Sequence, residues 1–289
     1  MRFDYRSRVA AALLTGVLYA ACGGSDGGDA DAGNGESGGE AAAEVAAIDP
    51  STVGTISGTI NFSGDAPAME AIDMSAEPDC AAGFGDEGPM MQSVVVNGGG
   101  LANVFVYLSA GVMDAPAPYG AATLDQTNCR YAPHVMGVQA GQTIEITNSD
   151  NLLHNINATP TENRGFNISQ PRAGITSRQS FAVAEVMVPL RCDVHGWMEA
   201  FVGVVDHPYF GVSGDGGMFT ISNVPAGTYT MTAWHEQYGT MGMEVTVTAG
   251  ETTMADFDHM GLQMAGHLVG EPLVIHHGSD EVVFNRAQQ

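Results

Sequence analysis

Cys192-Asp193-Val194-His195-Gly196-Trp197-Met198 is the stretch of sequence that decides how this chain folds and what it can bind. A thiol, an imidazole and a thioether lie within these seven residues, and a second imidazole, that of His154, lies upstream beside Asn155. The tight spacing sets the mutual geometry of three of these donors locally. One thiolate, two imidazoles and one thioether form the donor set of a mononuclear copper centre that exchanges single electrons.

Alternating polar and apolar residues predict β-strands on both sides of this stretch. Residues 141–148 alternate after a glycine turn, residues 149–153 turn the chain, and His154 begins the next strand. Residues 181–188 and 200–205 predict two further strands, so that Cys192 ends one strand and the chain returns as another. Short Val, Ile, Thr and Phe segments between Gly, Pro and Asn elsewhere in the chain indicate an all-β protein.

Two motifs together resemble the cupredoxin family. They are Gly-x-Thr…Asn-x-Asp-x-x-x-His-Asn and Cys-x-x-His-x-x-Met, over about residues 128–206, and the ligand loop is most similar to the amicyanin and plastocyanin type. The resemblance implies a Greek-key β-sandwich with one type 1 copper ion. It also implies that His154, Cys192 and His195 are strong equatorial ligands, that Met198 is a weak axial ligand, and that Asn155 steadies the strand beside the thiolate.

The position of His195 beside Gly196 suggests that its ring edge reaches the surface. Trp197 would add an apolar contact there, so we expect His195 and Trp197 to form the port through which electrons pass. Zinc or an empty site is the alternative, although a thioether suits zinc poorly.

The residues around Cys192 differ from the usual cupredoxin pattern in ways that bear on function. Leu190 stands where many cupredoxins have an aromatic residue, and Pro189 predicts a bulged or edge strand because proline has no N–H to donate. Multicopper oxidases and the usual copper nitrite reductases resemble cupredoxins but carry histidine next to the ligand cysteine. Here Arg191 and Asp193 flank Cys192, which implies an electron carrier rather than an enzyme.

The other cysteines have separate interpretations. Cys80 and Cys129 form an even pair in an exported chain, so we expect a disulfide. It would close a loop of roughly 50 residues and contribute about 3–5 kcal/mol in the loop-entropy model. A second metal site that uses Cys129 and His134 is the alternative.

The amino terminus predicts export. Met1–Ala21 has a basic start and a 13-residue apolar run, which is typical of a signal segment and too short to span a bilayer comfortably. Residues 18–22 resemble the bacterial lipoprotein cleavage box, which implies lipidation of Cys22; ordinary cleavage near Ala21 is the alternative. Residues 22–51 are rich in Gly and Asp and predict a flexible tether. We therefore expect a membrane-anchored lipoprotein that faces the periplasm or cell surface of a bacterium, with no other membrane contact.

The formal net charge of the chain is −24, and it has no lysine. This charge excludes nucleic acid as a reasonable partner. It favours a basic redox partner, such as a cytochrome-like protein, whose encounter rate falls with salt. Solubility in a salty habitat would explain the charge equally well.

A second module follows. The run from Asp215 to His235 resembles transthyretin-like regulatory domains of carboxypeptidases and related carbohydrate-binding-like sandwiches, with two alternating strands joined by Pro-Ala-Gly. Residues 52–110 contain strands that would complete this sandwich, and the copper core would then be inserted in it. The expected segments are a signal (1–21), a tether (22–51), a cupredoxin-like region (52–205, with the copper core at 128–205), a transthyretin-like sandwich (206–262) and a carboxyl-terminal tail (263–289).

Two other functions remain open from the sequence. One is copper handling, as in a chaperone or resistance protein, which the scattered Met and His residues near the carboxyl end would suit. The other is a structural or carbohydrate-binding surface protein. The sequence does not indicate the redox partner, the potential, the direction of electron flow or the oligomeric state.

Overall fold

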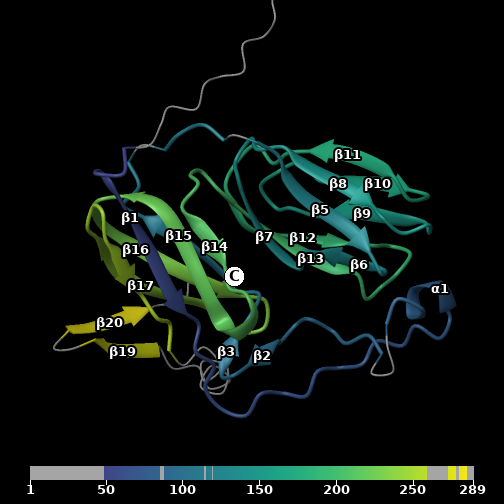
Figure 1. Ribbon diagram of the computed structural model, residues 1–289, viewed down its shortest axis with the longest axis horizontal. Coiled ribbons are helices and arrows are strands. Elements are labelled where there is room, and N and C mark those ends of the chain that lie inside the picture. Colours follow the sequence, from purple (N-terminus) through teal and green to yellow (C-terminus); the bar gives the residue numbers. More distant parts are fainter. Residues whose placement is uncertain are drawn as a thin grey trace, which may run out of the picture. The chain divides into compact units, whose positions relative to one another are not determined.

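The computed structural model describes residues 49–84, 88–113, 115–118 and 120–258, and the backbone of the hairpin of β19 (Leu273–His277) and β20 (Asp280–Phe284). Strands dominate this part of the chain, whose helices are α1 (Pro78–Ala81) and the 3-10 turn η1 (Asp215–Gly217) (Figure 1). The all-β prediction is confirmed. None of these helices has the length and apolar character needed to cross a bilayer. The predicted signal, Cys22 and nearly all of the tether lie outside the described residues, as do the side chains of the predicted tail.

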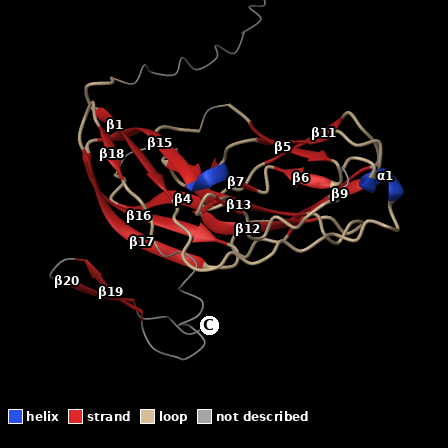
Figure 2. Ribbon diagram, turned by 60° about the horizontal axis from the view of Figure 1, so that its bottom comes forward, coloured by secondary structure: helices blue, strands red, loops and turns tan. Residues whose placement is uncertain are grey.

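The first sandwich carries the cysteine-histidine loop and consists of two mixed sheets, whose strands are seen side by side in Figure 2. Parallel pairs join β13 to β7 and β5 to β8, and the other pairs are antiparallel. In spatial order, the larger sheet comprises β10 (Phe166–Gln170), β9 (His154–Ala158), β12 (Glu185–Arg191), β13 (Glu199–Val205) and β7 (Val135–Gln139). The smaller sheet comprises β11 (Ile175–Gln179), β8 (Ile144–Asn148), β5 (Ala122–Thr127) and β6 (Arg130–Ala132).

Alternation along the strands explains how these two sheets face each other. In β8, Ile144 and Ile146 are buried while Glu145 and Thr147 are partly exposed, which is the period expected of a strand with one face in the core. Leu124 of β5 and Val202 of β13 lie in the same buried cluster, so the apolar faces of both sheets share one core.

Strand β12 is central in its sheet, between β9 and β13, so the edge alternative for Pro189 is wrong. The register with β13 shifts between Glu185 and Val188, just before Pro189, which agrees with the expected irregularity. Pro189 still pairs with Phe201, and its carbonyl accepts the N–H of Thr159. The strand therefore stays in the sheet up to the loop that begins at Cys192.

The second sandwich is formed by strands from both sides of the first sandwich in the sequence. One sheet comprises β15 (Met218–Pro225), β1 (Val53–Thr59) and β18 (Thr252–Met254). The other comprises β14 (Phe210–Val212), β4 (Phe105–Ala110), β16 (Gly227–His235) and β17 (Gly239–Val247). A short pair, β2 (Val96–Asn97) and β3 (Gly100–Leu101), lies beside η1. Residues 53–110 thus supply β1 and β4 to this sandwich.

Two phenylalanine rings packed on a pair of glycines join the sandwiches. Gly137 of β7 and Gly203 of β13 lie opposite each other in the sheet register. A Cβ added at Gly203 would lie 2.4 Å from a ring atom of Phe105, and one at Gly137 would lie 2.4 Å from the ring of Phe210. The two glycines leave the space that the phenylalanine rings of β4 and β14 fill.

We predict that Gly203→Ala lowers the free energy of unfolding by about 1–3 kcal/mol, because the added methyl group forces the buried Phe105 ring to move. Gly242→Ala is the matched control, since a Cβ there would lie 3.8 Å from its nearest neighbour. Chemical denaturation of both variants, with the disulfide intact, measures the difference. Equal effects would contradict this account of the junction.

Candidate metal centre

The ends of three strands position the predicted ligands. His154 is the first residue of β9, Cys192 follows the last residue of β12, and Met198 precedes β13. Two backbone bonds close the loop between β12 and β13: the N–H of Cys192 donates to the carbonyl of Met198 at 3.1 Å, and the N–H of Met198 donates to the carbonyl of His195 at 2.9 Å. The loop conformation is therefore set by its own backbone.

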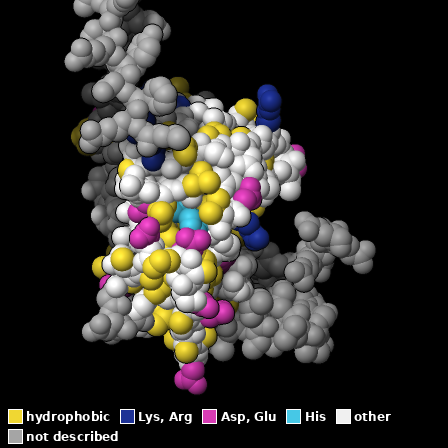
Figure 3. Space-filling view, turned by 90° about the vertical axis from the view of Figure 1, so that its right-hand side faces the viewer, with side chains coloured by type: hydrophobic (Ala, Val, Ile, Leu, Met, Phe, Trp, Pro, Cys, Tyr) yellow, Lys and Arg dark blue, Asp and Glu magenta, His cyan; other side chains and the backbone are white. Residues whose placement is uncertain are grey.

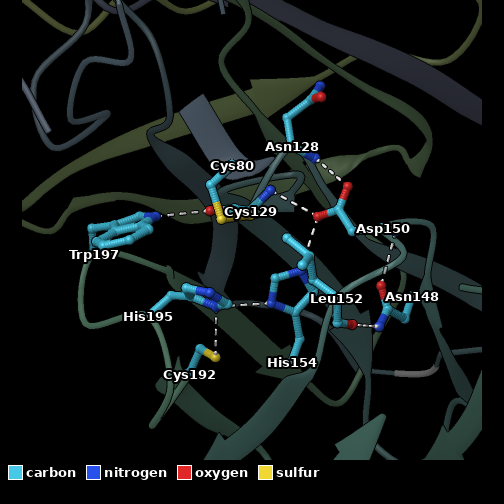
Figure 4. Close-up of a disulfide and its surroundings, with 10 residues drawn as sticks. All are labelled: Cys80, Asn128, Cys129, Asn148, Asp150, Leu152, His154, Cys192, His195 and Trp197. Atoms are coloured by element: carbon cyan, nitrogen blue, oxygen red, sulfur yellow. Dashed lines mark hydrogen bonds and ion pairs between the residues drawn. A yellow bond between two sulfur atoms is a disulfide. The ribbon is translucent and has the colours of Figure 1, made fainter. Parts of the chain in front are cut away.

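The thiol and both imidazoles converge. The Nδ1 atoms of His154 and His195 are 3.0 Å apart, and Nδ1 of His195 is 3.8 Å from Sγ of Cys192 (Figure 4). The three donor atoms all lie within 4.8 Å of one another. The side chains are 0%, 3% and 2% exposed for His154, Cys192 and His195. The structure thus contains a candidate His/Cys ligand group that is shielded from solvent.

Met198 is buried in the same core as Cys192. Its place on the ligand loop is the one expected of a weak axial ligand, and that role stays a prediction.

Asp150 orients His154. One carboxylate oxygen of Asp150 lies 2.9 Å from Nε2 of His154 and accepts the N–H of Cys129, while the other accepts the N–H of Asn128, both at 2.8 Å. A carboxylate at Nε2 holds the ring proton there, which leaves Nδ1 of the neutral ring as a free lone pair. The sequence did not indicate a role for Asp150, although this residue stands in the Asn-x-Asp-x-x-x-His motif, four residues before the histidine.

Asn155 lies beside the sulfur. Its Oδ1 is 3.3 Å from Sγ of Cys192 and accepts the N–H of Asp193 at 2.7 Å. Its Nδ2 donates to Asp193 and to Asn167 at 2.8 Å. Asp193 in turn accepts hydrogen bonds from the side chains of Asn157 and Asn167. These amide contacts anchor the first residue after the thiol to β9 and β10.

The surroundings favour a deprotonated sulfur. Burial by itself raises the pKa of Cys192, but hydrogen bonds from His154 and from the backbone of Asn155, His195 and Val194 outweigh it and lower the pKa. Thiolate is the form that binds a metal ion.

The two imidazoles differ. Burial and the nearby charge of His154 lower the pKa of His195, which favours its neutral form. Burial also acts to lower the pKa of His154, but hydrogen bonds to Cys192 and Asp150 outweigh it and raise the pKa. The two shifts have opposite directions, so a proton is favoured on His154 over His195, and a metal ion would compete with it there.

The expectation that the ring edge of His195 reaches the surface is wrong, since the side chain is 2% exposed. The sulfur atoms of Cys80 and Cys129 lie within 4.8 Å of a ring nitrogen of His195, and α1 carries Cys80. Trp197 is half-buried, packs on His195 with ring centroids 5.3 Å apart, and donates its Nε1–H to the carbonyl of Cys129 at 3.0 Å.

The predicted disulfide between Cys80 and Cys129 is confirmed, with an S–S distance of 2.05 Å. The alternative metal site at Cys129 and His134 is excluded, because the sulfur is bonded to Cys80 and His134 has other partners. Nε2 of His134 contacts the carboxylate of Glu236, and Nδ1 contacts the carbonyl of Glu199 at 3.1 Å. His134 thereby links the strand after the ligand loop to the end of β16.

Comparisons with known proteins gave partial matches. The family described as "Polysaccharide lyase family 4, domain II" matches residues 180–255, which run from before β12 through the ligand loop to β18. This is less than half of the chain, and it is a different family from the transthyretin-like one expected for the second sandwich. No curated protein matches.

Three similar solved structures have TM-scores far below 0.5, so we base no functional conclusion on them. A purple cupredoxin from Nitrosopumilus maritimus is 21% identical, with 29% of this chain and 98% of that chain covered, at a TM-score of 0.25. A methionine-to-alanine mutant of amicyanin in the Cu(I) state is 17% identical, with 34% and 97% covered, at 0.27. A copper-containing nitrite reductase from Thermus scotoductus SA-01 is 20% identical, with 34% and 24% covered, at 0.24.

We predict that Asp150→Asn weakens copper binding by about 10–100-fold, because an amide no longer fixes the proton on Nε2 of His154. Asp125→Asn is the matched control, since Asp125 accepts only the hydroxyl of Ser149 among the hydrogen bonds shown for its carboxylate. Competition against a chelator of known affinity measures both variants. Loss of affinity in both, or in neither, would contradict the assigned role of Asp150.

Proposed function

We propose that this protein holds one copper ion at His154, Cys192 and His195, with Met198 as a weak axial ligand, and carries single electrons. The observation that carries the proposal is the convergence of one thiol and two Nδ1 atoms within 4.8 Å in a buried cluster. The donor chemistry fits copper, which supplies one-electron redox chemistry when bound.

Burial of the ligands favours electron transfer over catalysis. Catalytic metal sites keep a position open for water or substrate, whereas these three side chains are at most 3% exposed. The residues on either side of Cys192 in the sequence are Arg191 and Asp193, so neither neighbour is a histidine that could lead electrons to a further metal cluster. The hydrogen bonds of Asp150 and Asn155 hold the donors in place and limit rearrangement when an electron arrives or leaves.

The end of the first sandwich that carries α1 offers a contact surface for a partner. Val194 and Leu153, each next to a ligand, are 47% and 45% exposed. Figure 3 looks onto this end and shows hydrophobic side chains in a band with acidic side chains among them. With the net charge of −24, these features support a basic redox partner that meets an apolar centre.

We predict that addition of Cu(II) to the mature chain gives an intense blue absorption that ascorbate bleaches, because a copper–thiolate bond forms at Cys192. Cys192→Ser should abolish the colour. Met198→Leu should keep the colour and raise the reduction potential, since loss of the thioether favours the reduced ion. Optical and paramagnetic-resonance spectra with a redox titration measure all three.

Other results would favour one of the alternative functions or contradict the role of Met198. A wild-type protein that binds copper without colour and exchanges it rapidly with chelators would indicate copper handling. A wild-type protein that binds none would indicate a structural or carbohydrate-binding role. A colourless Met198→Leu protein would contradict the axial assignment.

We further propose that the chain is a lipoprotein anchored in a bacterial cell envelope through Cys22. Support comes from the signal-like start and the cleavage-box residues that precede Cys22. We predict that Cys22→Ser moves the protein from the membrane fraction to the soluble fraction of the envelope, as measured by fractionation and immunoblotting. Continued membrane association of the exported variant would show that lipidation at Cys22 is not the anchor.

A further inference from the structure

Residues 63–84, which we call the cover, belong to neither sheet of the first sandwich, and the part from Ile72 to Phe84 packs on the core that contains Cys192. Met74 and Cys80 are the buried residues of the cover, and Ile72 and Phe84 pack half-buried on the core that contains Cys192. Its regular structure is the four-residue helix α1 and an isolated bridge between Ala71 and Met90. In Figure 1, α1 lies at the far end of this sandwich from β1.

The disulfide holds the cover close to His195, one of the proposed metal ligands. The sulfur atoms of Cys80 and Cys129 and a ring nitrogen of His195 lie within 4.8 Å of one another. Figure 4 shows the disulfide next to His195 and Trp197. This contact, with the neighbouring indole, accounts for the burial of an imidazole that would otherwise lie at the end of the sandwich.

The two ends of the disulfide are held very differently. Cys129 belongs to the turn between β5 and β6, where its N–H donates to Asp150 and its carbonyl accepts the Nε1–H of Trp197. These are residues that touch His154 and His195. Cys80 lies on a helix of one turn. The Cys129 side is therefore fixed to the ligand scaffold, and the Cys80 side is the part that can move away.

Side-chain packing, rather than a ladder of backbone hydrogen bonds to a strand, holds the cover on the core. Backbone bonds of Ile72 and Glu70 go to the neighbouring residues 89–91, not to a strand of the first sandwich. The ring of Phe84 lies 4.9 Å from the guanidinium carbon of Arg130. Segments with few buried contacts open locally at low free energy, unless a cross-link restrains them. The covalent bond joins positions 49 residues apart, and it is the strongest restraint on the cover.

We propose that the Cys80–Cys129 disulfide controls access to the metal ligands. With the bond intact, the cover stays over His195 and the ion is retained. A dithiol reductant opens it: the S–S bond accepts two electrons and two protons, two cysteine thiols form, and the dithiol becomes a disulfide. The cover then swings away from His195, and the ligands exchange metal with solution. The inference rests on the proposed copper site for the identity of the ion, but not for the accessibility of Cys192.

The test uses Cys80→Ala/Cys129→Ala, which removes both sulfurs of the disulfide, so that neither remains as a free thiol that could pair with Cys192. In the metal-free protein, we expect iodoacetamide to alkylate Cys192, located by mass spectrometry, at least about tenfold faster than in the wild type. In the Cu(I)-loaded protein, we expect transfer of copper to an excess of a Cu(I) chelator to accelerate by a similar factor. Cu(I) loading avoids any change in the oxidation state of the ion.

Ile221→Ala is the control for general destabilisation, because Ile221 is buried in the core of the second sandwich. It should leave both rates within about twofold of the wild type, since opening of the cover is a local event. If the double variant does not fold, the alkylation assay uses wild-type protein instead. This protein is reduced, freed of reductant and kept metal-free. Mass spectrometry then separates alkylation of Cys192 from alkylation of the two released thiols.

Equal alkylation and transfer rates with and without the disulfide would overturn the proposal and leave the copper site standing. A similar acceleration in Ile221→Ala would overturn it too, because the effect would then be global. Faster alkylation of Cys192 in a protein that binds no copper would instead support the role of the cover and refute the proposed function.

Discussion

The rest of this structure depends on three side chains that could bind a metal ion, His154, Cys192 and His195, which meet in a buried cluster. A thiol and two imidazoles without partners would be costly in a core, so each must be held by other groups. Asp150 holds His154 at Nε2, and Asn155 lies at Sγ of Cys192 while it binds the backbone of Asp193. The sheet pairing of β9 with β12 brings these two sets together, because β9 begins at His154 and β12 ends just before Cys192.

Strand β13 connects the ligand loop to the second sandwich. It starts directly after Met198, and its Gly203 lies under the ring of Phe105 from β4. The carbonyl of Glu199, at its first residue, contacts His134, whose other ring nitrogen contacts Glu236 after β16. Phe201 of the same strand packs against Trp234, with ring centroids 5.3 Å apart. The ligand loop is therefore followed at once by a strand that is fixed on both sides, and this limits how far the loop can relax.

Much of the site could be predicted from the sequence, since short spacings report local geometry. The loop from Cys192 to Met198 folds on itself. Its cysteine and histidine donors, Cys192 and His195, meet His154 as the motif spacing implied. The β-class and the disulfide followed from residue patterns in the same way. The expected strand at residues 181–188 runs instead from Glu185 to Arg191, because pairing with β13 and β9 decides its ends.

The cover could not be predicted, because residues 63–84 have no periodic pattern and their position depends on contacts distant in sequence. Pairing of Cys80 with Cys129 indicated a link, but nothing in the sequence indicated that the link would lie on His195. The surface exposure expected for that ring was wrong for this reason. The contacts of Trp234, His235 and Glu236 also depend on residues distant in sequence. His235 is buried, and burial and the nearby His134 lower its pKa to about 4. Trp234 contacts Phe201, and Glu236 contacts His134.

X-ray absorption spectroscopy of the copper-loaded protein at the copper edge tests the central claim most directly. The account predicts one short sulfur scatterer and two imidazole nitrogen scatterers around a single ion, with the sulfur lost in a Cys192→Ser protein. A first coordination shell of nitrogen and oxygen alone in the wild type would contradict it.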